Sequence, residues 1–214
     1  NNGNKISYQE SLIEQDNVDI EIQGHNHYMI KEIFEQKDTI RNAVQYSIEE
    51  LHDLIEAINK SNHVYTVGAG TAGFAAGQIA YYLRKIAKIN VTELKSYDID
   101  SYKEIFCDKD LIIAVSQSGE TADTIEALEI AKNKGVKIAS IVNMQGSTIT
   151  RISDYQFLSR SGPEICVAST KAFTAQISWG FLLAMSLVGK HDDAVNEIYR
   201  ISEMLENYFS SKKF

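Results

Sequence analysis

The chain has 214 residues, of which 44% are hydrophobic and 23% charged, ordinary proportions for a soluble globular protein of one large or two small domains. A formal net charge of −8 leaves no basic field that would attract nucleic acid or an anionic membrane surface. The most apolar window, residues 177–188, is shorter than the roughly 20 residues needed to cross a bilayer, so we expect no membrane partner.

Residues 1–26 are polar and rich in asparagine, which predicts a linker or tail. The first residue is Asn1 rather than methionine, so we expect a portion of a longer protein. Between residues 27 and 60, apolar side chains recur at steps of three and four, the spacing of amphipathic helices. This segment predicts two or three consecutive helices, with breaks near Lys37 and Ser47.

Strand and helix patterns alternate from residue 61 to residue 190. Short apolar runs predict five strands, at residues 63–67, 90–94, 111–115, 136–142 and 154–158. Helical segments are predicted between them, ending near residue 87 and covering residues 101–106, 121–134 and 147–152. A long apolar helix capped by Ser169 then extends to about residue 190, and an amphipathic helix over residues 191–214 closes the chain.

This alternation predicts right-handed crossovers and a parallel sheet with both faces covered. We therefore expect a single domain over residues 27–214, a three-layer αβα sandwich around a five-stranded parallel sheet of flavodoxin-like order, preceded by N-terminal helices. In such a sheet, ligands bind beyond the carboxyl ends of the first and third strands, where the strand order reverses.

Residues 116–121, with the sequence SQSGET, join the third predicted strand to a helix. Backbone N–H groups in the first turn of a helix lack internal partners, and the helix dipole makes that end positive. Hydroxyl groups placed there suit the oxygens of a phosphate. Helix capping by Ser118 would explain only one of the hydroxyls. We therefore expect this loop to form a phosphate-binding site.

The loop after the first strand, residues 68–73 with the sequence GAGTAG, allows three interpretations. Its glycines match the dinucleotide fingerprint, and Glu93 follows at the distance of a ribose-binding acid. The glycines equally suit close backbone packing at a strand-to-helix turn. In the third interpretation the loop is a wall of a sugar-phosphate site. The SQSGET loop across the switch point favours this one, because a nicotinamide enzyme does not need it.

Glu164 and residues 167–171 form a third candidate segment, ahead of the long apolar helix. Ser169 as a helix cap and Lys171 as a solvated charge would be a purely structural explanation. Alternatively, the segment closes over a ligand and touches it through its backbone. Glu164 is the only acid near the predicted pocket, and no residue is predicted to be catalytic.

The helix after Ser169 is apolar on almost every side, which is typical of a core helix or an interface. We expect both, with the interface belonging to a homodimer. Cys107 and Cys166 are isolated, and the five histidines have no metal-ligand spacing. These features predict reduced thiols, a cytoplasmic location, no metal and no cofactor.

Two stretches resemble signature sequences of the sugar isomerase (SIS) domain family, namely SQSGETADT at residues 116–124 and EICVASTKAFT at residues 164–174. More narrowly, they resemble the isomerizing glutamine–fructose-6-phosphate aminotransferase family. HYMIKEIFEQ at residues 27–36 resembles the segment that joins the glutaminase and isomerase domains of those enzymes. Together the matches span about residues 25–190.

The resemblance implies an SIS fold that binds fructose 6-phosphate or glucosamine 6-phosphate. By position, it assigns the phosphate to Ser116, Gln117, Ser118 and Thr121. It assigns the sugar to Gly70, Thr71, Val167, Ala168 and Ser169. The chain departs from the family pattern in two places, since Ala72 stands where serine is usual and Lys37 where proline is common.

The resemblance also implies partners outside this sequence, a glutaminase domain and a second SIS half. The proton-shuttling glutamate, ring-opening histidine and Schiff-base lysine of the family lie in later parts and have no match here. We therefore expect the phosphosugar-binding half of an isomerase domain, inactive alone. The alternatives are a stand-alone SIS aminosugar-phosphate sensor or isomerase module, and an NAD-type dinucleotide-binding oxidoreductase domain.

Overall fold

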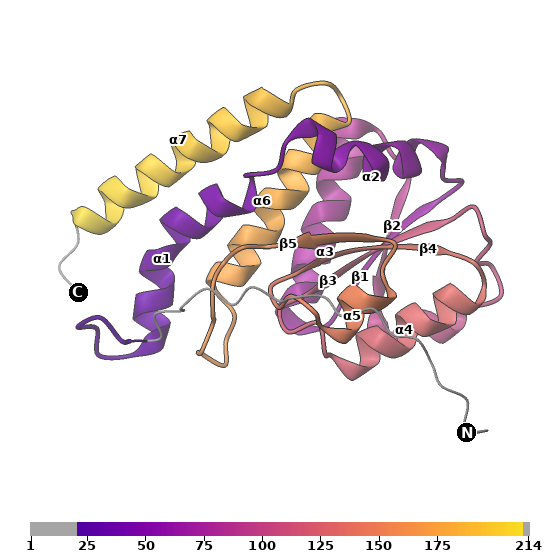
Figure 1. Cartoon of the computed structure of the whole chain (residues 1–214), viewed down its shortest axis with the longest axis horizontal. Coiled ribbons are helices and arrows are strands. Elements are labelled where there is room, and N and C mark those ends of the chain that lie inside the picture. The colour runs from indigo at the N-terminus through magenta and orange to yellow at the C-terminus, as the bar shows by residue number, and fades with distance from the viewer. Residues whose placement is uncertain (1–20, 212–214) are drawn as a thin grey trace, which may run out of the picture.

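A five-stranded parallel sheet forms the centre of the fold, in the strand order β2-β1-β3-β4-β5 (Figure 1). The computed structural model describes residues 21–211. Its strands are β1 (Val64–Gly68), β2 (Val91–Lys95), β3 (Leu111–Ser116), β4 (Lys137–Val142) and β5 (Tyr155–Leu158). The predicted α/β class and flavodoxin-like order are therefore confirmed.

Helices cover both faces of the sheet (Figure 1). They are α1 (Tyr28–Ala43), α2 (Ile48–Lys60), α3 (Gly70–Tyr82), α4 (Ala122–Asn133), α5 (Thr148–Ile152), α6 (Lys171–Ser186) and α7 (His191–Ser210). A π-helical turn, η1 (Leu83–Ala87), continues α3, and a 3-10 helix, η2 (Ser96–Ser101), follows β2. The larger core lies under α1, α2, α3, α6 and α7, and the smaller one under α4, α5 and η2.

β3 shows why the strands read as unbroken apolar runs. Its side chains alternate between the two cores: Leu111, Ile113 and Val115 enter the larger, and Ile112 and Ala114 the smaller. All six residues of the strand are buried. A strand covered on both faces needs apolar residues at every position rather than at every second one.

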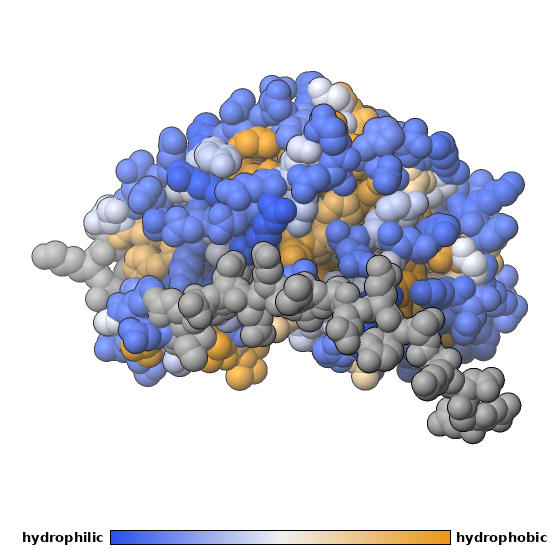
Figure 2. Space-filling model, in the orientation of Figure 1, coloured by the Kyte–Doolittle hydropathy of each residue, from blue (hydrophilic) through white to orange (hydrophobic). Residues whose placement is uncertain are grey.

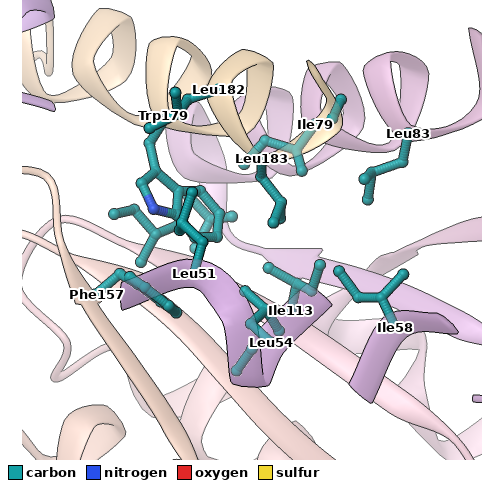
Figure 3. Packing of buried hydrophobic residues seen from close by; sticks show 14 of the residues in the cluster. Leu51, Leu54, Ile58, Ile79, Leu83, Ile113, Phe157, Trp179, Leu182 and Leu183 are labelled. Carbon is teal, nitrogen blue, oxygen red and sulfur yellow. The ribbon is translucent and has the colours of Figure 1, made fainter. Parts of the chain in front are cut away.

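Trp179 of α6 is the largest fully buried side chain (Figure 3). Its ring lies 5.2 Å from that of Phe157 on β5, measured between centroids. Leu51 and Leu54 of α2 belong to the same cluster. Burying each such side chain contributes about 1.5–3 kcal/mol, so this cluster fixes α2 and α6 to one face of the sheet.

The break predicted near Ser47 is confirmed, since Ser47 caps α2. Its hydroxyl accepts from the Glu50 N–H, and the Glu50 carboxylate accepts from the Ser47 N–H in return. The break predicted near Lys37 is wrong, because α1 continues through it. Lysine is a good helix former, and Lys37 here pairs with Glu206 of α7 at 3.3 Å.

Two further predictions about helices need correction. No helix spans residues 101–106, where one was expected. The 3-10 helix η2 lies earlier, at Ser96–Ser101, and turns follow it. Ile99 and Phe106 are both buried in the smaller core, and the irregular backbone between them allows this. Helix α6 ends at Ser186 rather than near residue 190, since Gly189 reverses the chain with φ +72°. Part of the linker expected at residues 1–26 lies outside the described residues.

The visible face of the molecule is largely hydrophilic, with hydrophobic residues showing in small patches (Figure 2). Within residues 21–211, no helix combines the length and hydropathy that a membrane span requires.

Candidate functional site

Three segments meet in a cleft of about 210 Å³ at the carboxyl edge of the sheet. They are the starts of α3 and α4 and the segment that leads into α6. The cleft is lined by Ala69, Thr71, Ala72, Ser116, Gln117, Ser118, Thr121, Glu164, Cys166, Val167, Ser169 and Gln176. Of the nine residues predicted to bind a ligand, seven line this cleft. Gly70 instead lines a neighbouring cleft, and Ala168 lines neither.

The SQSGET loop is shaped by its own hydroxyl groups. Ser116 Oγ accepts from the Gly119 N–H at 2.9 Å, and Ser118 Oγ accepts from the Glu120 N–H at 3.1 Å. Thr121, rather than Ser118, is the N-cap of α4, and its side chain makes no capping bond. The Thr121 hydroxyl lies 3.5 Å from Ser116 Oγ at the cleft wall. It is therefore positioned to meet a ligand.

The first turn of α4 points toward the same loop. The N–H groups at the start of a helix have no intrahelical partner, and they carry a positive partial charge. Helix α4 has 12 residues, enough for this effect. An oxyanion in the cleft would thus meet hydroxyls and backbone dipoles rather than a lysine or arginine, neither of which is among the lining residues.

The loop is anchored from outside by α5. The Ile149 N–H donates to the Gly119 carbonyl at 3.0 Å, and the Thr148 N–H donates to Glu120 Oε1 at 2.7 Å. The second bond lowers the pKa of Glu120 below its ordinary value of 4.5. Glu120 is therefore ionised at neutral pH and ties the loop to α5.

Two glycines of the GAGTAG loop are required by the close approach and conformation of the backbone. A Cβ at Gly68 would lie 2.6 Å from the Ala72 carbonyl oxygen, so only glycine allows the strand and helix this approach. Gly70 begins α3 with φ +56°. Glu93, the expected ribose ligand of the dinucleotide interpretation, pairs with Lys95 and lies against Gly77 within α3, rather than at the start of the helix.

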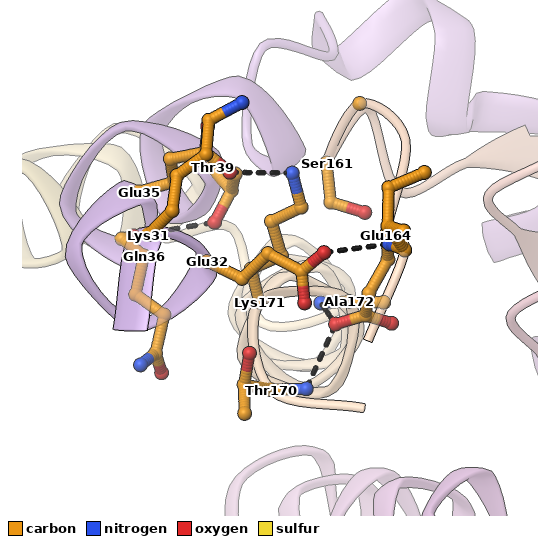
Figure 4. A network of polar contacts seen from close by, with 12 residues as sticks. Lys31, Glu32, Glu35, Gln36, Thr39, Ser161, Glu164, Thr170, Lys171 and Ala172 are labelled. Carbon is orange, nitrogen blue, oxygen red and sulfur yellow. Dashed lines mark hydrogen bonds and ion pairs between the residues drawn. The ribbon is translucent and has the colours of Figure 1, made fainter. Parts of the chain in front are cut away.

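Glu164 caps α6 instead of projecting freely into the cleft. Its Oε1 accepts from the Thr170 N–H at 2.8 Å and from the Ala172 N–H at 3.2 Å (Figure 4). The N-cap residue of α6 is Thr170, so the prediction that Ser169 caps this helix is wrong. Two of the N–H groups at the start of α6 are thus bound by a carboxylate from earlier in the chain, and the Ser169 side chain lines the cleft instead.

Lys171 is buried, not solvated as the structural explanation assumed. Its side chain is 4% exposed, and its ammonium lies 2.6 Å from Glu35 of α1. Glu35 also pairs with Lys31 at 3.4 Å. Helix α1 therefore packs against the start of α6 through charged groups as well as apolar ones (Figure 4).

Gln176 is a cleft residue that the sequence did not single out. It is 1% exposed on α6, and its amide donates to the Ser116 carbonyl at 3.0 Å. The available signal was an amide within an otherwise apolar helix. Cys166 and Ala69 also line the cleft and were likewise missed.

The lining residues suit binding better than proton transfer. Glu164 is the only carboxylate among them, and its Oε1 is already engaged by two N–H groups. Residues 21–211 contain no group of three or more histidine, cysteine, aspartate or glutamate side chains arranged for a metal ion. The arrangement can hold an anion at one end and hydroxyl groups at the other.

Comparisons with known proteins agree on one family. The SIS domain profile matches residues 57–186. A glutamine–fructose-6-phosphate aminotransferase (isomerizing) from Pyrococcus horikoshii is 39% identical over 165 residues, which cover 77% of this chain and 28% of that protein. One from Methanococcus maripaludis is 33% identical over all of this chain and 36% of its own length.

A solved structure shows the same fold. The C-terminal domain of glucosamine-fructose-6-phosphate aminotransferase from Francisella tularensis superposes with a TM-score of 0.70 and 32% identity, over 86% of this chain and 55% of that one. The chain spans about a third of the length of the curated relatives it matches.

Proposed function

The chain belongs to the SIS domain family, and from that premise we propose that it binds a phosphosugar in the cleft beyond β1 and β3. The ligand we propose is fructose 6-phosphate or glucosamine 6-phosphate. The observation that carries the proposal is the SQSGET loop, whose hydroxyls and helix start face a cleft without a lysine or arginine. Neutral donors of this kind hold a phosphate with about 1.5–3 kcal/mol for each charge-assisted bond.

In this proposal the two ends of the ligand meet different segments. The phosphate is bound by Ser116, Gln117, Ser118 and Thr121. The sugar is held by Thr71 and by the segment from Val167 to Ser169, through backbone groups as well as the Ser169 hydroxyl. Gly70 and Ala168 shape these segments without lining the cleft themselves.

The chain would serve as the binding half of the isomerase part of a glutamine–fructose-6-phosphate aminotransferase. Moving a proton between C1 and C2 of the sugar requires a base within hydrogen-bond reach of those carbons. Glu164 caps α6 and is a poor candidate. We propose that the catalytic groups come from a second SIS half and the ammonia from a glutaminase domain, in the cytoplasm.

A thermal melt tests the binding claim. At 100 times its dissociation constant, fructose 6-phosphate should add about 2.7 kcal/mol and raise the melting temperature by about 5–10 °C. Fructose without phosphate and NADH should leave the melt unchanged. A shift with NADH but not with either sugar phosphate would instead favour the dinucleotide interpretation.

Thr121→Val is the matched variant for this melt. Its unliganded melting temperature should stay close to that of the parent chain, because the Thr121 side chain makes no capping bond. Its shift with fructose 6-phosphate should fall by an amount that corresponds to about 1.5–3 kcal/mol of lost binding. An undiminished shift would remove Thr121 from the site.

We also propose a homodimer formed on the α6 side. No residue of α6 is fully exposed, so the helix itself is covered by its neighbours α1, α3 and α7. Its partly covered residues Ile177 and Phe181 line an apolar groove of about 290 Å³ together with Ile201 and Leu205 of α7. A second copy packed over this groove would cover them, and a monomer in sedimentation at high micromolar concentration would contradict the proposal.

A further inference from the structure

Residues 167–169, which we propose contact the sugar, are flanked by two backbone stretches that are each hydrogen-bonded to a carboxylate. Before them, Glu32 of α1 accepts from the Ile165 N–H at 2.6 Å and from the Cys166 N–H at 3.1 Å. After them, Glu164 accepts from the N–H groups of Thr170 and Ala172. Along the chain, residues 167–169 lie between the N–H groups that these two carboxylates bind.

Side-chain packing does not hold these three residues in place. The Val167 side chain is fully exposed, Ala168 is exposed, and Ser169 is half-buried. Three residues without buried apolar side chains have little to fix their backbone. Their position against the cleft must therefore come from the hydrogen bonds on either side of them.

Glu32 forms these hydrogen bonds from a distant part of the sequence, and burying its carboxylate there costs stability. It is 1% exposed, and its second oxygen, Oε2, is buried without a hydrogen-bond partner among the described residues. A buried carboxylate with one unsatisfied oxygen is destabilising unless its bonds bring a compensating gain. Both hydrogen bonds of Glu32 to the segment that leads into α6 come from backbone N–H groups just before the cleft residues 167–169.

We propose that Glu32 is a positioning residue for sugar recognition. It fixes the backbone of Ile165 and Cys166, and thereby the orientation of residues 167–169, without touching the ligand. The inference rests on the proposed function, since it concerns the sugar end of the same cleft. It assigns no role to Glu32 at the phosphate end, which α4 and α5 hold independently.

The test compares two phosphate esters, of which only one carries a sugar. In Glu32→Ala, the affinity for fructose 6-phosphate should fall by about 10–100-fold, by analogy with the loss seen when a group that orients a metal ligand is removed. The affinity for glycerol 3-phosphate should not change. Glu32→Gln should recover most of the loss, because its amide oxygen accepts the same two N–H groups. Glu203→Ala, an exposed change on α7, is the control.

Amide hydrogen exchange in the unliganded proteins provides a second readout. Glu32→Ala should speed exchange at Ile165 and Cys166 while leaving Gly119 and Glu120 unchanged. An equal loss of affinity for both ligands would mean that Glu32 supports the fold in general rather than sugar recognition, and would overturn the inference. Unchanged exchange at Ile165 and Cys166 would overturn it too, whether or not any ligand binds. If the parent chain binds neither ligand, the proposed function fails. The exchange experiment still shows whether Glu32 orders the backbone of Ile165 and Cys166.

Discussion

Gly119→Ala should lower the free energy of unfolding by about 2–5 kcal/mol, as measured by urea denaturation. Gly119 has φ +68°, a conformation that costs alanine about 1–2 kcal/mol. In addition, the new Cβ would lie 2.5 Å from the Cβ of Ser147, inside the distance that real side chains tolerate. Relieving that overlap must move either the SQSGET loop or α5, so phosphosugar binding should weaken as well.

Gly189→Ala separates the two contributions. Gly189 has nearly the same backbone angle, φ +72°, but no atom lies within 4 Å of its missing Cβ. Its substitution should therefore cost only the backbone strain, about 1–2 kcal/mol, and leave phosphosugar binding unchanged. Equal losses of stability in the two variants would contradict a packing role for Gly119 against Ser147.

Glu35→Leu should destabilise the chain by about 3–5 kcal/mol, since it removes the carboxylate that faces a buried ammonium. The Lys171 side chain is 4% exposed and lies 2.6 Å from Glu35, whose own side chain is 28% exposed. The substitution would also remove the ion pair of Glu35 with Lys31. Chemical denaturation at neutral pH measures the loss.

Adding Lys171→Met to Glu35→Leu should restore a large part of that stability, because an apolar pair replaces the uncompensated charge. The exposed pair of Lys37 with Glu206 is the matched control, since it also links α1 to another helix. Glu206→Ala should cost less than about 1 kcal/mol. If the double variant is less stable than the sum of its single changes predicts, the unpaired-charge explanation is wrong.

The strands and the SQSGET loop could be predicted from the sequence because burial leaves a local pattern of apolar residues there. Strands covered on both faces appear as continuous apolar runs, and the hydroxyl-rich SQSGET loop follows directly from one of them. Parallel topology then brings the ends of β1 and β3 to the same edge, so the meeting of the two loops could be predicted. The capping box at Ser47 is an equally local signal.

What the sequence could not show are partners far apart along the chain. Glu32 and Ile165 are 133 residues apart, and Glu35 and Lys171 are 136 apart. A serine beside a helix start is often a cap and a lysine there is often solvated, so the purely structural explanation of this segment gave those roles to Ser169 and Lys171. The real cap, Glu164, lies six residues before Thr170, and the loop between them is also held by hydrogen bonds to Glu32 of the distant helix α1.

Thiol footprinting tests phosphosugar binding in the cleft most directly, because the chain carries its own probe and its own control. Cys166 lines the cleft, whereas Cys107 precedes β3 at the opposite edge of the sheet. Fructose 6-phosphate at 100 times its dissociation constant should slow the alkylation of Cys166 by up to about 100-fold and leave Cys107 unaffected. Equal alkylation rates at Cys166 with and without the ligand, once binding is saturated, would place the phosphosugar elsewhere and contradict the assignment.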